Sequence, residues 1–265
     1  MLILNRYSRL YAAFVRNCIM RAMEYRAQFL TNIVVYNIWT ASSLLVITVV
    51  FQQVGAVRDW NRWEMYVLYG TYVIIENLCY GMLGPNMWRF NTYVREGTLD
   101  LVLTKPVNSQ FFASTRYIDM NAMANIPVGT ALLIFGLVRC GTTPSPLALL
   151  SWLLALGCGF LVAYSIWFMI VTLTIWIVKL QAAGAAFEPV FQIARFPITI
   201  YPRRFQALLT FALPVACLTT IPAGLLLGKR GGEWLAFTML AAAIALTISN
   251  RFWNFALRHY GSASS

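Results

Sequence analysis

Three acidic side chains lie inside stretches of sequence that are otherwise apolar: Glu76, Asp119 and Glu188. A charged group at membrane depth costs roughly 2.5–3.5 kcal/mol on insertion scales, so it normally faces a pathway, a partner charge or the membrane surface. Glu76, within "YVIIENLCYG", has no cation in its own stretch. We therefore expect Glu76 to face a bound substrate.

The other two acids each have an arginine nearby that would neutralise them. Asp119 lies three residues from Arg116, a spacing that brings side chains together on one face of a helix, and an ion pair is the favoured interpretation. For Glu188, pairing with Arg195 and a place on the pathway are equally supported. Because these stretches hold acids and no deep lysine, and the chain has 9 Trp and 13 Tyr, a pathway lined by Glu76, Asp119 and Glu188 suits a cationic aromatic compound.

Chemistry that depends on histidine or on a metal ion is excluded by the available side chains. The chain has one histidine, His259, and none of its cysteines forms a Cys-x-x-Cys pair. One histidine supplies neither a His-based metal site nor a His-dependent catalytic pair within one chain. We expect no metal site and no enzymatic activity, and we expect the cysteines to be small apolar filler: Cys18, Cys79, Cys140, Cys158 and Cys217.

The composition is that of a membrane protein. Of the 265 residues, 60% are hydrophobic and 11% are charged, whereas soluble domains carry about 25% charged residues. The mean hydropathy is +0.66. The net charge of +11 therefore indicates loops that face anionic lipid and the cytoplasm, and no nucleic-acid partner is expected.

Apolar runs of about 20 residues predict the membrane-spanning helices. We predict an all-α integral membrane protein with six transmembrane helices within residues 29–257. Five of the spans are placed by their apolar runs: Phe29–Phe51, Glu64–Leu83, Gln110–Val138, Leu147–Val178 and Glu233–Leu257.

The fifth span in chain order is ambiguous. Either Leu180–Thr199 crosses the membrane and residues 201–228 dip into it and return, or Phe205–Gly228 crosses and residues 179–204 form a cytoplasmic loop. Pro214 and Pro222 would each break a lipid-facing helix, which favours the re-entrant alternative. Basic residues at 203 and 204 favour the opposite one.

The N-terminal segment is predicted to lie on the membrane surface. Residues 1–28 carry five arginines, which exclude a signal peptide, and their apolar side chains share one helical face. Basic residues are also dense in residues 85–116 and sparse in the hairpins at 52–63 and 139–146. Both termini, including a tail at 258–265, are therefore expected in the cytoplasm.

A polar segment separates the second and third spans. Within residues 95–106, "REGTLDLVLTKP", Thr98 is suited to cap a short helix and Pro106 to end it. A short amphipathic helix outside the bilayer needs a surface for its leucines. From the residues alone, a partner protein and the underside of the chain's own bundle are about equally supported.

Two separated motifs resemble those of one family. The stretch "EGTLDLVLTKPV" is similar to the E-G-T-L-[DE]-x-L-L-x-x-P-[VL] signature of ABC-2 type transporter permeases, with Val102 where many relatives have leucine. The stretch "RFPITIYPRRFQALLTFALPVACLTTIPAGLLLGK" and the terminal "RHYGSASS" resemble a bacterial ABC-2 subfamily once filed as a domain of unknown function. The resemblance covers essentially the whole chain.

The resemblance implies a half-transporter in the bacterial inner membrane. It implies a dimer with a second permease, of the same or another kind, and a separate ABC ATPase dimer that binds ATP and Mg; "GLLLGKR" is not a P-loop. Residues 1–28 become a connecting helix, and residues 201–228 an outer re-entrant segment. The helix within 95–106 becomes a coupling helix with these ATPase contacts: Glu96, Gly97, Thr98, Leu99, Asp100 and Leu103.

The predicted function is export of a cationic or amphipathic toxic compound. Export of a lipid or glycan, which relatives also carry out, is the competing hypothesis. A passive channel or scaffold explains the spans but not a coupling helix.

Overall fold

The computed structural model describes residues 2–24, 26–177 and 183–260, and most of these residues are helical. In this described part, one two-stranded antiparallel hairpin pairs Ala56 with Asn61 and Val57 with Trp60. The longer helices and the two short strands are, in chain order, α1 (Leu2–Glu24), α2 (Arg26–Val54), β1 (Ala56–Val57), β2 (Trp60–Asn61), α3 (Arg62–Met82), α4 (Gly84–Arg95), α8 (Ile126–Cys140), α9 (Pro146–Thr172) and α13 (Gly232–His259).

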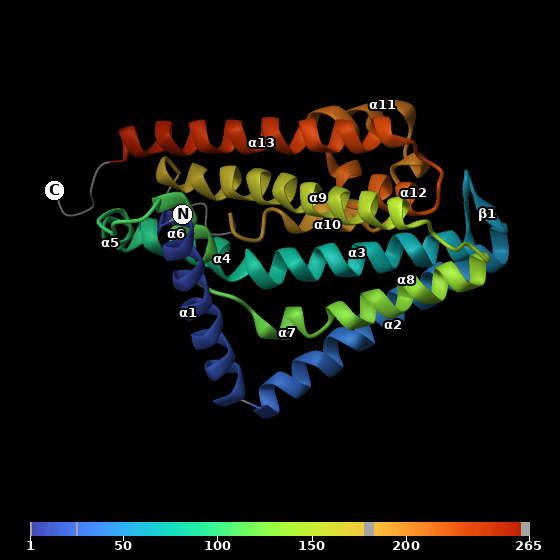
Figure 1. The fold of residues 1–265 in the computed structure, drawn as a ribbon, viewed down its shortest axis with the longest axis horizontal. Coiled ribbons are helices and arrows are strands. Elements are labelled where there is room, and N and C mark those ends of the chain that lie inside the picture. Colours follow the sequence, from blue (N-terminus) through green and yellow to red (C-terminus); the bar gives the residue numbers. More distant parts are fainter. Residues whose placement is uncertain (1, 25, 178–182, 261–265) are drawn as a thin grey trace.

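Helix α3 is the centre of the bundle. Thirteen of its 21 residues are buried, and α8 and α9 run alongside it (Figure 1). Glycines bring α3 and α8 into backbone contact: a Cβ added to Gly70 would lie 2.6 Å from the Leu133 nitrogen, and one added to Gly129 would lie 3.0 Å from the Gly70 oxygen. Small residues allow such close approach between membrane helices, where packing rather than hydrophobicity drives association.

Among the described residues, four helical segments are long and apolar enough to cross a membrane: Arg26–Val54, Met120–Cys140, Pro146–Ile175 and Gly232–His259. A bent pair in the region 203–226 would make a fifth. Helix α3 is not among them, because Glu76, Asn77 and several tyrosines lower its hydropathy. The all-helical membrane architecture is therefore as predicted, and the number of six spans stays a prediction.

The third predicted span is wrong as a continuous helix. In place of one helix over Gln110–Val138 there are α6 (Ser109–Thr115), an extended segment, α7 (Met120–Met123) and then α8. The extended segment is held by bonds from distant residues. Asn86 donates to the Tyr117 oxygen (2.8 Å) and accepts from the Tyr117 nitrogen (2.9 Å), and the Asp119 nitrogen donates to the Gly81 oxygen (2.8 Å).

The ambiguous region contains no continuous spanning helix in its described part. Helix α10 (Glu188–Ala194) has only seven residues, which contradicts a single helix over Leu180–Thr199; residues 180–182 of that prediction lie outside the described residues. A single helix over Phe205–Gly228 is also wrong. Residues 203–212 and 215–226 form two helical arms bent by 75°, with Pro214 between them. Such a pair is either a broken span or a re-entrant loop, so the re-entrant segment 201–228 stays a prediction.

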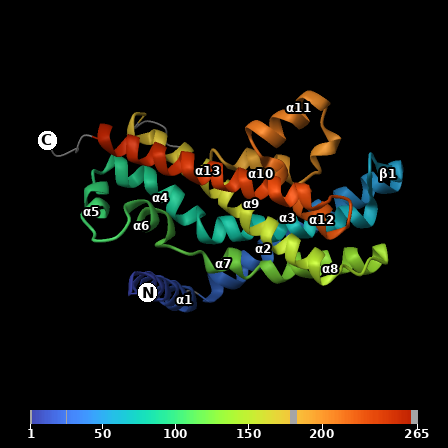
Figure 2. The ribbon, with the colours of Figure 1, turned by 45° about the horizontal axis from the view of Figure 1, so that its top comes forward.

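The two ends of the bundle are built differently. Helix α5 (Leu99–Leu103), α6 and the C-terminal end of α13 lie at one end of the long axis, and the β-hairpin lies at the other (Figures 1 and 2). Helix α1 runs across the long axis (Figure 1). Its Phe14 ring meets the Phe112 ring of α6 edge-on at 5.9 Å. Of the predicted tail 258–265, residues 261–265 lie outside the described part.

Candidate functional site

A cavity of about 560 Å³ lies between α2, α3 and α10. It brings together two of the acids singled out from the sequence, Glu76 and Glu188, with one cation, Arg195. Helix α2 supplies the opposite wall through polar side chains at the spacing of one helical face, Tyr36, Thr40 and Ser43. The cavity is thus a charged and hydrogen-bonding chamber in an otherwise apolar bundle.

The carboxylate of Glu76 is held by two tyrosines. The Tyr36 hydroxyl donates to Glu76 Oε2 (2.7 Å), and the Tyr72 hydroxyl, one turn earlier on α3, donates to Glu76 Oε1 (2.5 Å). Asn77 in turn donates to the Tyr36 oxygen (2.6 Å). A carboxylate oxygen accepts more than one hydrogen bond, so Glu76 is fixed in position and still able to bind a cation.

Arg195 ends α10 and is half-buried beside Tyr72, with its guanidinium carbon 5.6 Å from the centre of the Tyr72 ring. Its Nε atom is buried and has no hydrogen-bond partner. Within the described ranges, the ion pairs closer than 4.0 Å are Arg95–Glu96 and Lys229–Glu64. The Glu188–Arg195 ion pair considered from the sequence is therefore not formed, although both side chains line one cavity.

Asp119 lies outside this cavity. It caps α7 by accepting bonds from the Asn121 backbone nitrogen (2.8 Å) and side-chain nitrogen (2.8 Å). It lines a smaller cavity of about 240 Å³, to which Tyr36 also contributes. The Arg116–Asp119 ion pair favoured from the sequence is wrong: the Arg116 guanidinium instead lies 5.1 Å from the centre of the Tyr117 ring.

A short helix, α5, lies where the coupling helix is predicted, and its role stays a prediction. Some of its apolar side chains are buried and one is exposed to solvent. Leu99 and Val102 are 0% and 3% exposed, packed in the chain's own core, and Leu103 packs against that core. Leu101 is 65% exposed. Leu99 therefore offers no surface to an ATPase, which corrects that part of the prediction. The exposed apolar side chain of α5 is Leu101, a residue that the family signature leaves variable.

The polar residues around α5 shape the turn that precedes it. Gly97 has φ +68°, a left-handed conformation that favours glycine, and this allows the sharp break between α4 and α5. Glu96 is exposed and forms a surface ion pair with Arg95 at 3.7 Å. Thr98 precedes α5 but makes no side-chain capping bond, contrary to the expectation from its type.

The C-terminal end of the last helix is close to α5. Burial and, second, the charge of Asp100 raise the pKa of the Tyr260 hydroxyl. Tyr260 packs against the same core as Leu99 and Val102. The position of α5 is therefore fixed from two sides, by its own buried leucine and valine and by the end of α13.

Residues 37–264 match the model of a family described as ABC-2 family transporter protein. The chain belongs to this family. It is therefore a multi-pass membrane protein and a transporter membrane component, of a kind that normally works with an ABC ATPase. A comparison with curated proteins found no match.

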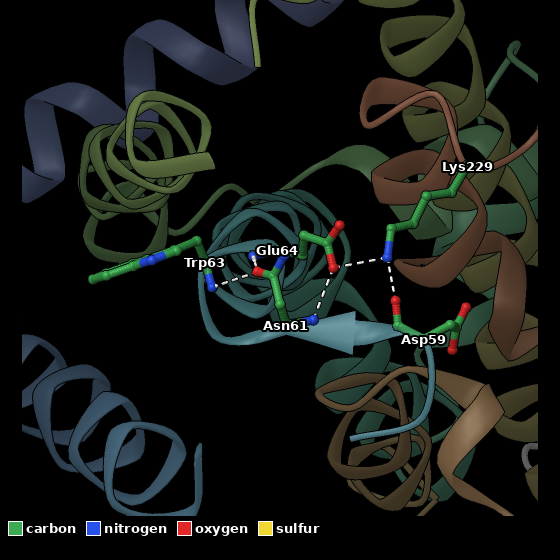
Figure 3. Close-up of polar contacts among 5 residues, drawn as sticks. All are labelled: Asp59, Asn61, Trp63, Glu64 and Lys229. Atoms are coloured by element: carbon green, nitrogen blue, oxygen red, sulfur yellow. Dashed lines mark hydrogen bonds and ion pairs between the residues drawn. The ribbon is translucent and has the colours of Figure 1, made fainter. Parts of the chain in front are cut away.

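The opposite end of this ABC-2 protein carries a polar cluster that sequence reasoning missed (Figure 3). Asn61 accepts from the Trp63 and Glu64 nitrogens (2.9 and 3.0 Å), and Glu64 accepts from the Asn61 nitrogen (2.8 Å). Lys229 donates to Glu64 Oε2 at 2.7 Å and to the Asp59 carbonyl. The Asn-x-x-Glu spacing, a capping-box pattern, is the signal that would have revealed the first half of this cluster.

Proposed function

We propose that this chain is the permease subunit of an ATP-driven ABC-2 exporter that moves a cationic or amphipathic toxic compound out of the cell. The observation that carries the proposal is the cavity in which Glu76 and Glu188 face α2. In this proposal the chain crosses the bacterial inner membrane six times with both termini in the cytoplasm. It pairs with a second permease and is powered by a separate ATPase dimer that holds ATP and Mg.

The position of the cavity suits a substrate that arrives from the bilayer. Of the apolar window of α2, only 11% is buried in the chain, and Trp39, which lines the cavity, is 71% exposed. An amphipathic cation would leave its apolar part beside α2 and place its charge at Glu76. A desolvated carboxylate attracts a cation strongly, and exposed indole rings add cation–π attraction.

The α5 end supplies a reason to expect an ATPase. Leu101 is an exposed apolar side chain on a short helix whose Leu99 and Val102 are buried, and Glu96 is exposed nearby. In this proposal the ATPase covers Leu101, and its movement reaches the bundle through Leu99 and Val102.

Transport of ethidium into inside-out vesicles tests the proposal. Vesicles would come from cells that co-express the chain and an ABC ATPase subunit. Glu76→Gln should lower the initial ATP-dependent rate about tenfold, because one charge-assisted contact is lost. Glu233→Gln, at the exposed start of α13, is the matched control and should transport normally. Native rates in Glu76→Gln vesicles would reject the role of Glu76.

A second candidate function is export of a lipid or a glycan. The observation in its favour is Arg195, a cation inside the same cavity that a purely cationic substrate does not need. ATP-dependent loss of a fluorescent phospholipid from the inner leaflet, with no transport of ethidium, would favour this candidate.

A further inference from the structure

We propose that Arg195 forms an anion-binding subsite beside Glu76 and Glu188, so that the ligand of this cavity is a zwitterionic amphiphile. Its cationic group would lie at the two carboxylates, its phosphate or similar anion at the guanidinium, and its apolar chain beside α2. This inference rests on the proposed function of the cavity as a transport site. It narrows the substrate class from cationic or amphipathic compounds to zwitterionic amphiphiles.

The first support is that Arg195 is only partly paired within the chain. A guanidinium carries five N–H donors in a planar fork that matches phosphate and carboxylate groups. Arg195 interacts with the Tyr72 hydroxyl, but its Nε is buried without a partner, and the side chain lines the cavity. Buried donors are almost always paired in folded proteins, so this Nε is free to bind an acceptor, from a ligand or from water.

The second support is the charge balance of the cavity. Glu76 receives its bonds from the neutral hydroxyls of Tyr36 and Tyr72, and neither carboxylate forms an ion pair within the described part of the chain. A simple cation would satisfy the acids but be repelled by Arg195. A simple anion would bind Arg195 but be repelled by the two carboxylates. A ligand with both charges satisfies all three groups, which matters most where water is scarce.

The third support is size and access. A volume of about 560 Å³ lies within the usual range for small-molecule sites, roughly 300–1,000 Å³, and suits a head group better than a whole lipid. Trp39 and Val46, on the α2 side of the cavity, are both exposed. The apolar chain of the ligand can therefore remain in the bilayer while its head group enters.

A series of probes with one tail and three head groups tests the proposal. The full chain, with its ATPase, would be reconstituted in nanodiscs. Radiolabelled dodecyltrimethylammonium, dodecylphosphocholine and dodecyl phosphate would be dialysed against it below their micellar concentrations, with empty nanodiscs subtracted. We expect the native protein to bind the phosphocholine probe about tenfold more tightly than the trimethylammonium probe, the gain from one charge-assisted contact.

Substitutions then assign the preference to named residues. Arg195→Gln should remove the tenfold preference and should not weaken trimethylammonium binding, which can only tighten when the repelling cation is removed. Arg195→Lys should keep part of the preference, because it retains the charge but not the fork. Glu76→Gln should weaken both probes that carry a cation. Melting temperatures of all variants in the nanodiscs separate these effects from loss of folding.

Two results would overturn the proposal. One is equal affinity of the native protein for the phosphocholine and trimethylammonium probes; if ethidium export nevertheless occurs, the proposed function stands and this inference fails. The other is an equal loss of both probes in Arg195→Gln and Arg195→Lys, which would make Arg195 a structural residue. Absence of saturable binding for every probe, together with absence of ethidium export, rejects both the inference and the proposed function.

Discussion

Side chains at the two ends of the bundle differ in how far they are paired or buried within the chain. At the β-hairpin end, Asn61, Glu64 and Lys229 bind one another, and the lysine ties the turn before α13 to the hairpin. At the α5 end, Leu101 is 65% exposed and Thr98 caps nothing. Polar side chains pair with one another at the hairpin end, whereas at the α5 end an exposed leucine lies on a short helix that has no side-chain cap. In the proposed function, the α5 end is the one that meets the ATPase.

The largest expected effect separates the two faces of α5. Leu99→Asp would place a charge where the native side chain is fully buried, at a cost of several kcal/mol. The variant should fail to accumulate as a monodisperse protein in size-exclusion chromatography. Leu99→Met, which nearly conserves volume, should behave as native. A monodisperse Leu99→Asp protein would show that α5 does not pack as described.

Leu101→Asp should preserve the fold of the chain and prevent binding of the ABC ATPase. Because Leu101 is exposed, the charge costs little in the isolated chain but would be buried against an ATPase. The amount of ABC ATPase that co-purifies should fall at least tenfold, as measured by quantitative immunoblotting of the co-expressed complex. Val54→Asp, equally exposed at 62% but near the hairpin, is the control and should retain the ATPase. Equal retention in both variants would remove α5 as the docking element.

Side-chain capping of a helix should contribute to stability at the hairpin end but not at the α5 end. Asn61→Ala removes two bonds to backbone nitrogens at the start of α3 and should lower the free energy of unfolding by about 1 kcal/mol. Thr98→Ala removes no capping bond and should change stability by less than about 0.5 kcal/mol. Thermal unfolding in detergent measures both. Equal losses would mean that the two ends are not organised as differently as their contacts indicate.

An effect of similar size, but one that salt weakens, concerns the ion pair at the hairpin end. Lys229→Gln should cost about 1 kcal/mol, the upper end of the range for ion pairs at a protein surface, because the side chains of Lys229 and Glu64 are only 25% and 16% exposed and salt screens such a pair only in part. The loss should shrink as salt concentration rises in thermal unfolding. Lys105→Gln, an exposed lysine at the α5 end, should show no loss at any salt concentration. A salt-independent loss in Lys229→Gln would point to the bond with the Asp59 carbonyl instead.

Much of the fold could be predicted because long apolar runs leave few alternatives. The helices Arg26–Val54, Pro146–Thr172 and Gly232–His259 follow their hydropathy closely. The extended segment between α6 and α7 could not be predicted, because it is held by bonds between Asn86 and Tyr117, residues 31 positions apart. The inward position of Leu99 was also beyond reach, since α5 has only five residues and so shows little periodicity.

The candidate site was predictable only in part, for a similar reason. A carboxylate in an apolar run is visible in the sequence, and Glu76 does line a cavity. That Arg195 lies in the same cavity depends on how α3 and α10 pack, which no local pattern encodes. The Tyr72–Glu76 bond has the i, i+4 spacing of a helix, so this one of the two tyrosine bonds to Glu76 could have been predicted from the sequence.

Tyr36 contributes to both the 560 Å³ cavity and the 240 Å³ cavity that Asp119 lines. Its side chain therefore forms part of the wall of both cavities. The bonds to Glu76 and from Asn77 hold the Tyr36 hydroxyl in place. In the proposed function, a cation that takes the place of the Tyr36 hydroxyl at Glu76 would break one of these bonds, so that substrate binding at the first cavity would alter a wall of the second.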